Sequence, residues 1–193
     1  FNLARRRKDE GSSGTLICVD KANVLGSFAF FRKIFDERAK HFPDIDAQHG
    51  YVDAIGLWMV KQPWVFDVLV TENMFGDILS DVGAGLMGGM GFAPSADIGD
   101  EHAVLQPCHG SAPDIMGQGK ANPIAAFLSG AMMLSWLGDE HALEQCKRAA
   151  SMIYNAVNTA FADGTLVPYE LGGNAGTAEI TEAVVAAMGR AAA

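Results

Sequence analysis

The sequence predicts an α/β protein with a largely parallel sheet, and two observations support this prediction. Short runs of β-branched and other apolar residues alternate along the 193-residue chain with longer stretches in which apolar residues recur at helical spacing. The chain is also 49% hydrophobic and 19% charged, which is the composition of a folded globular protein and excludes a disordered one.

The first part of the chain supplies the predicted strands. The run TLICVD at 15–20 is rich in β-branched and apolar residues, which is typical of a buried strand. Apolar residues at helical spacing follow it and stop before Pro43, because proline disrupts a helix interior. The elements expected here are a helix end at 1–8, strands at 15–20, 45–49 and 66–71, and helices at 28–42 and 51–60.

Helices dominate the prediction for the second part. Apolar residues from Phe75 to Leu86 recur on one face of a helix, and a glycine-rich region follows, in which the stretch near Gly88 is the best candidate for a crossing between two lobes. Asn122 and Pro123 predict another helix start, because asparagine is a strong N-cap and proline suits the first helical position. The later helices are expected at 123–137, at 140–161 and from 177 onward.

Charge and cysteine content narrow the class of partner and the location. The net charge of −9 argues against a nucleic-acid partner. The longest apolar stretch, 125–137, is interrupted by Ser129 and Gly130 and is too short to span a membrane. The three cysteines are widely spaced and form no C-x-x-C pair, which favours a reducing, cytoplasmic location with free thiols.

Asp77 and Asp81 form the sharpest candidate for a metal site. They lie one turn apart on a predicted helix, so both carboxylates point the same way and repel each other. A Mg²⁺ or Mn²⁺ ion between them would remove the repulsion and take the oxygen ligands that these ions prefer. The alternatives are a solvent-facing acidic stripe, or Asp77 serving only the helix N-terminus.

Three glycines downstream match a known cofactor pattern, but in the wrong structural setting. Gly83, Gly85 and Gly88 fit G-x-G-x-x-G, the dinucleotide-binding pattern of Rossmann folds. That site needs a strand before the glycines and a helix opening after them, whereas here a helix precedes them. We therefore reject a Rossmann site and interpret the glycines as positions that permit close packing or a turn.

Lys21 and Asp53 are further candidates for chemistry, and each has a structural alternative. Lys21 directly follows the strand at 15–20, and ligands bind at the carboxyl ends of strands in an open α/β sheet. A buried lysine near a cation can exchange protons near neutral pH, whereas the alternative is a surface lysine at a turn. Asp53 opens a predicted helix, where the ordinary role of an aspartate is the N-cap.

A loop of small residues at 109–123 (HGSAPDIMGQGKANP) is the candidate nucleotide site. Glycine, serine and alanine let backbone N–H groups approach a phosphate or ribose closely. Asp114 could accept hydrogen bonds from two ribose hydroxyls and would repel a 2′-phosphate, which favours NAD over NADP. The alternative is an ordinary connecting loop with Asn122 acting only as a helix cap, and the two roles of Asn122 are compatible.

Together these residues resemble the isopropylmalate/isocitrate/tartrate dehydrogenase family of metal-dependent β-decarboxylating dehydrogenases, most closely its 3-isopropylmalate and tartrate enzymes. The resemblance covers essentially the whole chain, because five motifs occur in family order and with family-like spacing. They are VDKANVL at 19–25, YVD at 51–53, TENMFGDILSD at 71–81, the loop at 109–123, and LGG at 171–173 with GT at 176–177.

The resemblance implies a two-lobed fold, distinct from the Rossmann fold, of which this chain is the C-terminal part. Residues 1–87 would belong to the central, dimer-forming lobe with the metal and lysine site. Residues 88–193 would belong to the larger lobe with the loop that binds the adenosine of NAD. The implied assembly is a homodimer with a shared active site.

The resemblance also implies a role for each candidate residue. Asp53, Asp77 and Asp81 match the three metal carboxylates, and Lys21 matches the group that removes the hydroxyl proton of the substrate. Lys21 and Asp53, the catalytic candidates, are expected to come from the partner subunit, and Asn23 is expected near the nicotinamide. The residues that match the adenosine-binding loop are His109, Gly110, Ser111, Ala112, Asp114 and Asn122.

The implied reaction is oxidation of a 2-hydroxy acid by NAD and loss of its β-carboxylate as CO₂, assisted by Mg²⁺ or Mn²⁺. The implied substrate is of the 3-isopropylmalate, tartrate or malate type. One departure is Gln106-Pro107, where the family usually has Glu-Pro, because a neutral amide cannot supply that carboxylate's charge. The family's substrate arginines and tyrosine belong to an N-terminal half, so this chain alone is expected to be inactive.

Two other classes of function stay open from the residues. One is a non-catalytic subunit or assembly module of the same family, although it would have no physical need for Lys21, Asp53, Asp77 and Asp81 together. The other is a metal-dependent hydrolase or phosphatase built on Asp77 and Asp81. This last class is the least favoured, because no nucleophile with a partnered base accompanies the two carboxylates.

Overall fold

The computed structural model describes residues 1–191, which fall into two compact units. The first unit is Phe1–Gly83, and the second begins at Ala84. The division lies within helix α4 (Asn73–Met87), whereas the predicted crossing lies at the end of the same helix, after residue 87.

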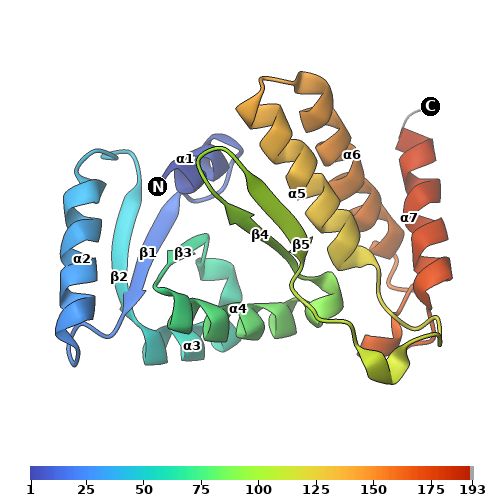
Figure 1. The fold of residues 1–193 in the computed structure, drawn as a ribbon, viewed down its shortest axis with the longest axis horizontal. Helices are drawn as coiled ribbons and strands as arrows, with labels where there is room; N and C mark the ends of the chain where they lie inside the picture. Colours follow the sequence, from blue (N-terminus) through green and yellow to red (C-terminus); the bar gives the residue numbers. More distant parts are fainter. Residues whose placement is uncertain (192–193) are drawn as a thin grey trace. The chain divides into compact units, whose positions relative to one another are not determined.

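The first unit is built on a three-stranded parallel sheet with the strand order β2-β1-β3 (Figure 1). The strands are β1 (Thr15–Asp20), β2 (Asp46–Tyr51) and β3 (Val68–Val70). The helices are α1 (Asn2–Asp9), α2 (Gly26–Ala39), α3 (Val52–Lys61) and the first part of α4, with a 3₁₀ turn η1 (Pro63–Val65). The parallel pairing of β1 with both neighbours confirms the α/β prediction for this unit.

Strand β1 is covered on both faces, which explains its unbroken apolar sequence. Strands that are buried on both faces lose the usual alternation of polar and apolar residues. One face packs against α1 and α2, and the other packs against α3 and α4. The buried residues on the side of α1 and α2 are Ala4, Leu16, Cys18, Phe35 and Ile45. The buried residues on the side of α3 and α4 are Ile17, Val19, Ile55 and Leu79.

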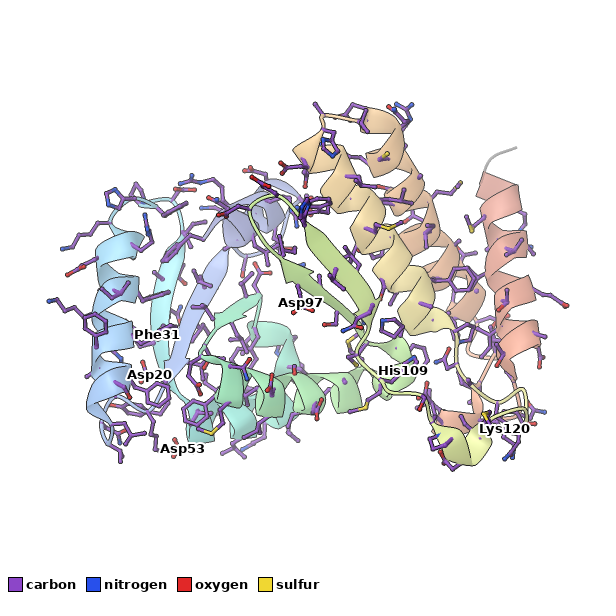
Figure 2. The ribbon with its side chains drawn as sticks, viewed as in Figure 1. Asp20, Phe31, Asp53, Asp97, His109 and Lys120 are labelled. Atoms are coloured by element: carbon purple, nitrogen blue, oxygen red, sulfur yellow. The ribbon has the colours of Figure 1, made fainter. Side chains whose placement is uncertain are left out.

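The register of the sheet brings two candidate residues to one edge. Asp20, the last residue of β1, is paired with Tyr51, the last residue of β2. Lys21 and Asp53 follow these strands within two residues, so both begin at the carboxyl edge of the sheet, where α/β proteins bind ligands. Figure 2 shows Asp20 and Asp53 at this end of the first unit.

The second unit combines an antiparallel strand pair with long helices (Figure 1). The strands are β4 (Pro94–Ile98) and β5 (Ala103–Pro107). The helices are α5 (Ile124–Glu140), α6 (Glu144–Phe161) and α7 (Thr177–Ala191), with 3₁₀ turns η2 (Met90–Phe92), η3 (Pro113–Ile115) and η4 (Tyr169–Leu171). The core of this unit is Ile124, Ala156, Val157, Ala175, Ile180, Val184 and Ala187.

The second unit differs from the prediction in two places. Its strand pair is antiparallel, whereas a largely parallel sheet was expected, and β4 lies inside the region predicted only as glycine-rich. Helix α6 begins at Glu144 rather than 140, because α5 continues to Glu140 and Ala142 then takes a φ of 54°, which a helix cannot contain. None of the helices in residues 1–191 is long and apolar enough to cross a membrane.

Candidate active site

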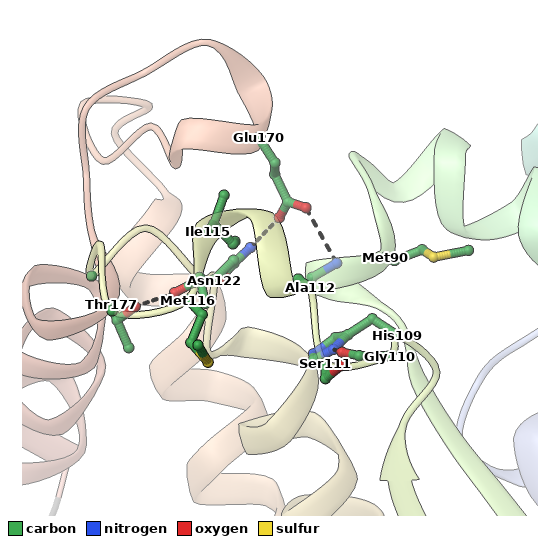
Figure 3. Close-up of a pocket in the computed structure, with 14 residues that line it drawn as sticks. Met90, His109, Gly110, Ser111, Ala112, Ile115, Met116, Asn122, Glu170 and Thr177 are labelled. Atoms are coloured by element: carbon green, nitrogen blue, oxygen red, sulfur yellow. Dashed lines mark hydrogen bonds between the residues drawn. The ribbon is translucent and has the colours of Figure 1, made fainter.

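A cavity of about 510 Å³ lies in the second unit, at the loop that the sequence marks as the candidate nucleotide site. Figure 3 shows the loop, the start of α5 and the segment that carries Glu170 around this cavity. The lining residues are Met90, Gly91, His109, Gly110, Ser111, Ala112, Ile115, Met116, Gly117, Gly119, Ala121, Asn122, Glu170 and Thr177. Most of them are small, so the backbone itself forms much of the wall.

Left-handed backbone conformations shape this loop. Ala112 has a φ of 43°, and Gly117 and Gly119 have φ values of 75° and 65°. Glycine reaches this region without the steric cost that a Cβ brings, which accounts for the two glycines. A Cβ at Gly110 would meet no atom within 4 Å, so the backbone there borders open space that a ligand could use.

Asn122 joins the loop to helix α5. The residue is buried, and its Oδ1 accepts a hydrogen bond from the backbone N–H of Ile124 at 3.1 Å. Helix α5 begins at Ile124, one residue later than predicted, and Pro123 precedes its first turn. Asn122 still supplies the acceptor for the first N–H of the helix. Its Nδ2 donates to Glu170 Oε1 at 2.6 Å.

Thr177 and Glu170 line the cavity without having been predicted as site residues. The Thr177 hydroxyl donates to the carbonyl of Ala121 at 2.5 Å, and its backbone N–H donates to the carbonyl of Gly119 at 2.8 Å. The start of α7 therefore holds the far end of the loop. A sequence signal was present for both residues, since Glu170 precedes the LGG motif and Thr177 ends the GT motif.

The structure separates the predicted nucleotide residues into two groups. His109, Gly110, Ser111, Ala112 and Asn122 line the cavity. The other two are Asp114, which is exposed in η3 and absent from the lining, and Asn23, which lies exposed in the first unit. Gln106, the departure from the family pattern, lies in β5 opposite Ser95. The roles of these residues toward a cofactor stay predictions.

Lys21 and Asp53 are in direct contact at the carboxyl edge of the first sheet. Lys21 Nζ donates to Asp53 Oδ1 at 2.5 Å, and the Lys21 side chain is only 27% exposed. This hydrogen bond lowers the pKa of Asp53. Helix α3 begins at Val52 with Tyr51 as its N-cap, which places Asp53 inside the first turn, so the N-cap interpretation of Asp53 is wrong.

A buried ion pair between Asp20 and Arg32 holds the turn that carries Lys21. Asp20 has no exposed surface, and Arg32 donates to both of its oxygens at 2.8 Å. The backbone N–H of Ala22 donates to Asp20 Oδ1 at 2.8 Å, on the far side of Lys21. Burial alone would raise the pKa of Asp20, but the bonds from Arg32 and Ala22 outweigh it and lower that pKa.

Cys18 lies beside this carboxylate and is not a nucleophile. Burial, with the neighbouring charge of Asp20, raises the pKa of the Cys18 thiol to about 12. A thiol with this pKa stays protonated at neutral pH, and the thiolate is the reactive form. All three cysteines, Cys18, Cys108 and Cys146, are free.

Asp77 and Asp81 are exposed on α4, one turn apart as predicted. Asn73 Nδ2 donates to Asp77 Oδ2 at 2.9 Å. The first N–H groups of α4 bond instead to the carboxylate of Glu72, so Asp77 does not serve the helix N-terminus. In residues 1–191, no three histidine, cysteine or acidic side chains gather as a metal site, so one chain does not bring Asp53 to Asp77 and Asp81.

Comparison with known proteins places the chain in one family. The family model described as isocitrate/isopropylmalate dehydrogenase matches residues 1–184. The 3-isopropylmalate/3-methylmalate dehydrogenase of Methanocaldococcus jannaschii is 48% identical over 185 residues, which cover 95% of this chain and 53% of that protein. The isocitrate/homoisocitrate dehydrogenase of Thermus thermophilus is 49% identical over 175 residues, which cover 90% of this chain and 50% of that protein.

Solved structures give the same picture for the fold. The crystal structure of isocitrate dehydrogenase from Methylococcus capsulatus matches with a TM-score of 0.84 and 41% identity, over 96% of this chain and 53% of that one. A β-decarboxylating dehydrogenase from Thermococcus kodakarensis matches with a TM-score of 0.82 and 36% identity, over 98% of this chain and 53% of that one. The chain therefore spans about half the length of the curated relatives and structures that it matches.

Proposed function

Since this chain belongs to the isocitrate/isopropylmalate dehydrogenase family, we propose that the full-length protein carries out NAD-dependent oxidative decarboxylation of a 2-hydroxy acid. The substrate is of the 3-isopropylmalate, tartrate or malate type, and the reaction requires Mg²⁺ or Mn²⁺. The observation that carries this proposal is the Lys21–Asp53 pair, which puts a protonatable amine and a carboxylate together at the carboxyl edge of a parallel sheet.

The cavity of the second unit fits the adenosine end of NAD. Its lining is made of small side chains and backbone, and Gly110 borders open space. No lysine or arginine is among the described residues that line it, whereas the carboxylate of Glu170 is. A cavity with this charge favours the free 2′-hydroxyl of NAD over the 2′-phosphate of NADP, which needs a cationic partner.

The donor chemistry of the first unit fits a hard divalent cation. Asp53, Asp77 and Asp81 offer exposed carboxylate oxygens, the ligands that Mg²⁺ and Mn²⁺ prefer. We propose that Asp77 and Asp81 of one copy and Asp53 of a second copy complete the site. When bound there, the cation supplies Lewis-acid stabilisation of the negative charge that develops on the substrate oxygen.

Lys21 is the residue that moves a proton in the proposed reaction. When NAD is bound, its nicotinamide would supply the hydride acceptor for C2 of the substrate. Lys21 Nζ would take the hydroxyl proton, so that the hydroxyl becomes a ketone. The β-carboxylate then leaves as CO₂, and its electron pair passes toward the new ketone. Asp53 holds Lys21 Nζ in place, and the Asp20–Arg32 pair holds the turn that carries Lys21.

An exposed apolar stretch on α3 supports the proposed homodimer. Leu57, Trp58 and Val60 are 56%, 41% and 61% exposed, which is unusual for large apolar side chains grouped on one short helix. Asp53 lies on the same helix, so a second copy bound along α3 would be close to the Lys21–Asp53 pair. A cytoplasmic location stays a prediction, and the three free thiols are consistent with it.

An activity panel on the full-length protein tests this proposal. The protein is assayed with Mn²⁺ and NAD against 3-isopropylmalate, isocitrate, homoisocitrate, D-malate and tartrate, and NADH formation is followed. We expect NADH and CO₂ in equal amounts with at least one substrate, and a much lower rate with NADP. Absence of NADH with every member of the panel would contradict the proposal and favour a non-catalytic subunit.

A further inference from the structure

Glu170 lies where three separate segments of the second unit meet. Its Oε1 accepts from Nδ2 of Asn122 at 2.6 Å, and its Oε2 accepts from the backbone N–H of Gly91 at 3.3 Å (Figure 3). These partners are 48 and 79 residues away in the sequence. Glu170, Asn122 and Gly91 all line the cavity, so one carboxylate ties together three parts of its wall.

Two glycines leave room for this carboxylate. A Cβ at Gly91 would lie 2.5 Å from Glu170 Oε1 and 2.8 Å from Cβ of Asn122. A Cβ at Gly89 would lie 2.7 Å from Glu170 Oε2. All three distances are shorter than van der Waals contact, so any larger residue at Gly89 or Gly91 would displace Glu170. The close approach therefore depends on these two glycines as well as on Glu170.

The acceptor character of Glu170 fixes the orientation of the Asn122 side chain. An ionised carboxylate can only accept hydrogen bonds, so the Nδ2 side of Asn122 must face it. Oδ1 of Asn122 then faces the start of α5, where it accepts a hydrogen bond from the backbone N–H of Ile124. A reversed amide would set oxygen against the carboxylate and N–H against N–H, which loses both bonds.

We propose that Glu170 is a positioning residue for nucleotide binding. It holds Asn122 and the backbone of η2 so that the loop at 109–123 keeps the shape that receives the adenosine end of NAD. This inference rests on the proposed function, and it names a residue outside the motifs on which that function is based. Glu170 acts through Asn122 and Gly91 rather than through the reacting atoms.

The substitution Glu170→Gln tests the role with almost no change in size. Glutamine offers one acceptor and one donor, whereas both partners of Glu170 are donors, so one bond must be lost. In the full-length protein we expect about tenfold weaker binding of NAD and of ADP-ribose, as for one hydrogen bond to a charged group. Glu170→Asp keeps two acceptors and should bind both ligands more tightly than Glu170→Gln.

The matched control is Glu179→Gln, which removes one negative charge from the exposed first turn of α7. It should leave both dissociation constants unchanged. The KM for the hydroxy acid at saturating NAD should be unchanged in all three variants, because a positioning role at the adenosine end does not extend to the substrate.

Three results would overturn the proposal, and they differ in meaning. ADP-ribose binding by Glu170→Gln within about twofold of wild type would show that Glu170 does not position the site. An equal rise in the KM for the hydroxy acid would indicate a general structural role instead. Failure of the wild-type protein to bind ADP-ribose at all would remove the nucleotide site itself, and the proposed NAD chemistry with it.

Discussion

Asp20 is a fully buried acidic side chain, and its surroundings explain how a charge persists there. Arg32 supplies two hydrogen bonds and the opposite charge, and the N–H of Ala22 supplies a third bond. Burying one charge without a partner is strongly unfavourable, whereas a pair with this geometry is tolerated. The consequence is that three hydrogen bonds to Asp20 hold the turn at Lys21, as the proposed role of Lys21 requires.

The pH dependence of the free energy of unfolding tests the contribution of the Asp20–Arg32 pair. The folded-state pKa of Asp20 is lowered, so its contribution is complete above the ordinary carboxyl pKa of about 4 and is lost as the pH falls through the folded value. We expect Asp20→Asn to reduce the free energy of unfolding by about 3 kcal/mol at neutral pH, and the difference from wild type to narrow below about pH 4.

The measurement is urea unfolding followed by tryptophan fluorescence in a Trp136→Phe background, which leaves Trp58 and Trp64, both in the first unit. The control is Asp44→Asn. The pKa of Asp44 is lowered to about 2 by its hydrogen bond with Arg5, but that pair is exposed and should matter much less. A pH-independent difference for Asp20→Asn would contradict the account.

Asp77 tests the separation of the metal and nucleotide sites. Asp77→Asn keeps the size of the side chain but removes a charged oxygen ligand, so the activity of the full-length protein should lose its response to Mn²⁺. The dissociation constant for NAD should stay within about twofold of wild type, because Asp77 is not part of the loop cavity. Asp100→Asn, an exposed aspartate elsewhere, is the control. A large loss of NAD binding by Asp77→Asn would contradict this separation.

Local motifs and long-range contacts differ in how far the sequence reveals them. The Asp77–Asp81 spacing and the small-residue loop at 109–123 are visible because their residues are neighbours in the chain. The contacts of Glu170 are not visible, because its partners lie 48 and 79 residues away. The Arg32–Asp20 pair was also missed, since nothing in the sequence distinguishes Arg32 from the other charged residues of α2.

Among the helices and strands, the most accurate prediction was that of β1, which is buried on both faces. Strand β1 matches its predicted bounds at both ends, because burial on both faces leaves an unbroken apolar run with polar ends. The β4–β5 pair was not predicted, because its strands are only partly buried and mix apolar residues with polar residues and proline. The pair packs against helix α5, and a local sequence pattern cannot reveal such packing.

Substitutions in helix α7 test the hydrophobic core of the second unit. Ile180 is fully buried in the core cluster that also contains residues of α5 and α6, whereas Val185 on the same helix is 54% exposed. We expect Ile180→Ala to lower the free energy of unfolding of the second unit by about 2–5 kcal/mol, and Val185→Ala to change it by less than about 0.5 kcal/mol. Fluorescence of Trp136, with Trp58 and Trp64 replaced by phenylalanine, reports this unit. Equal effects of the two substitutions would show that α7 does not pack as described.

For the whole molecule, the chain spans about half the length of its curated relatives, and within the described residues 1–191 its candidate metal ligands do not gather into one site. The Lys21–Asp53 pair lies on one edge of the first unit, with the exposed apolar residues of α3 beside it. A shared site accounts for both observations, because each copy would lend Lys21 and Asp53 to the carboxylates on α4 of the other.

Complementation between inactive subunits shows whether two copies of the chain complete one site. Full-length Lys21→Ala and Asp77→Asn proteins, each inactive alone, are mixed, unfolded and refolded together, and NADH formation is measured. A heterodimer should contain one intact site, so random pairing should restore roughly a quarter of wild-type activity. The matched mixture of Lys21→Ala with Asp53→Asn should stay inactive, because both losses fall on the same side of the shared site. Equal recovery in the two mixtures, or none in either, would contradict a site completed by two copies.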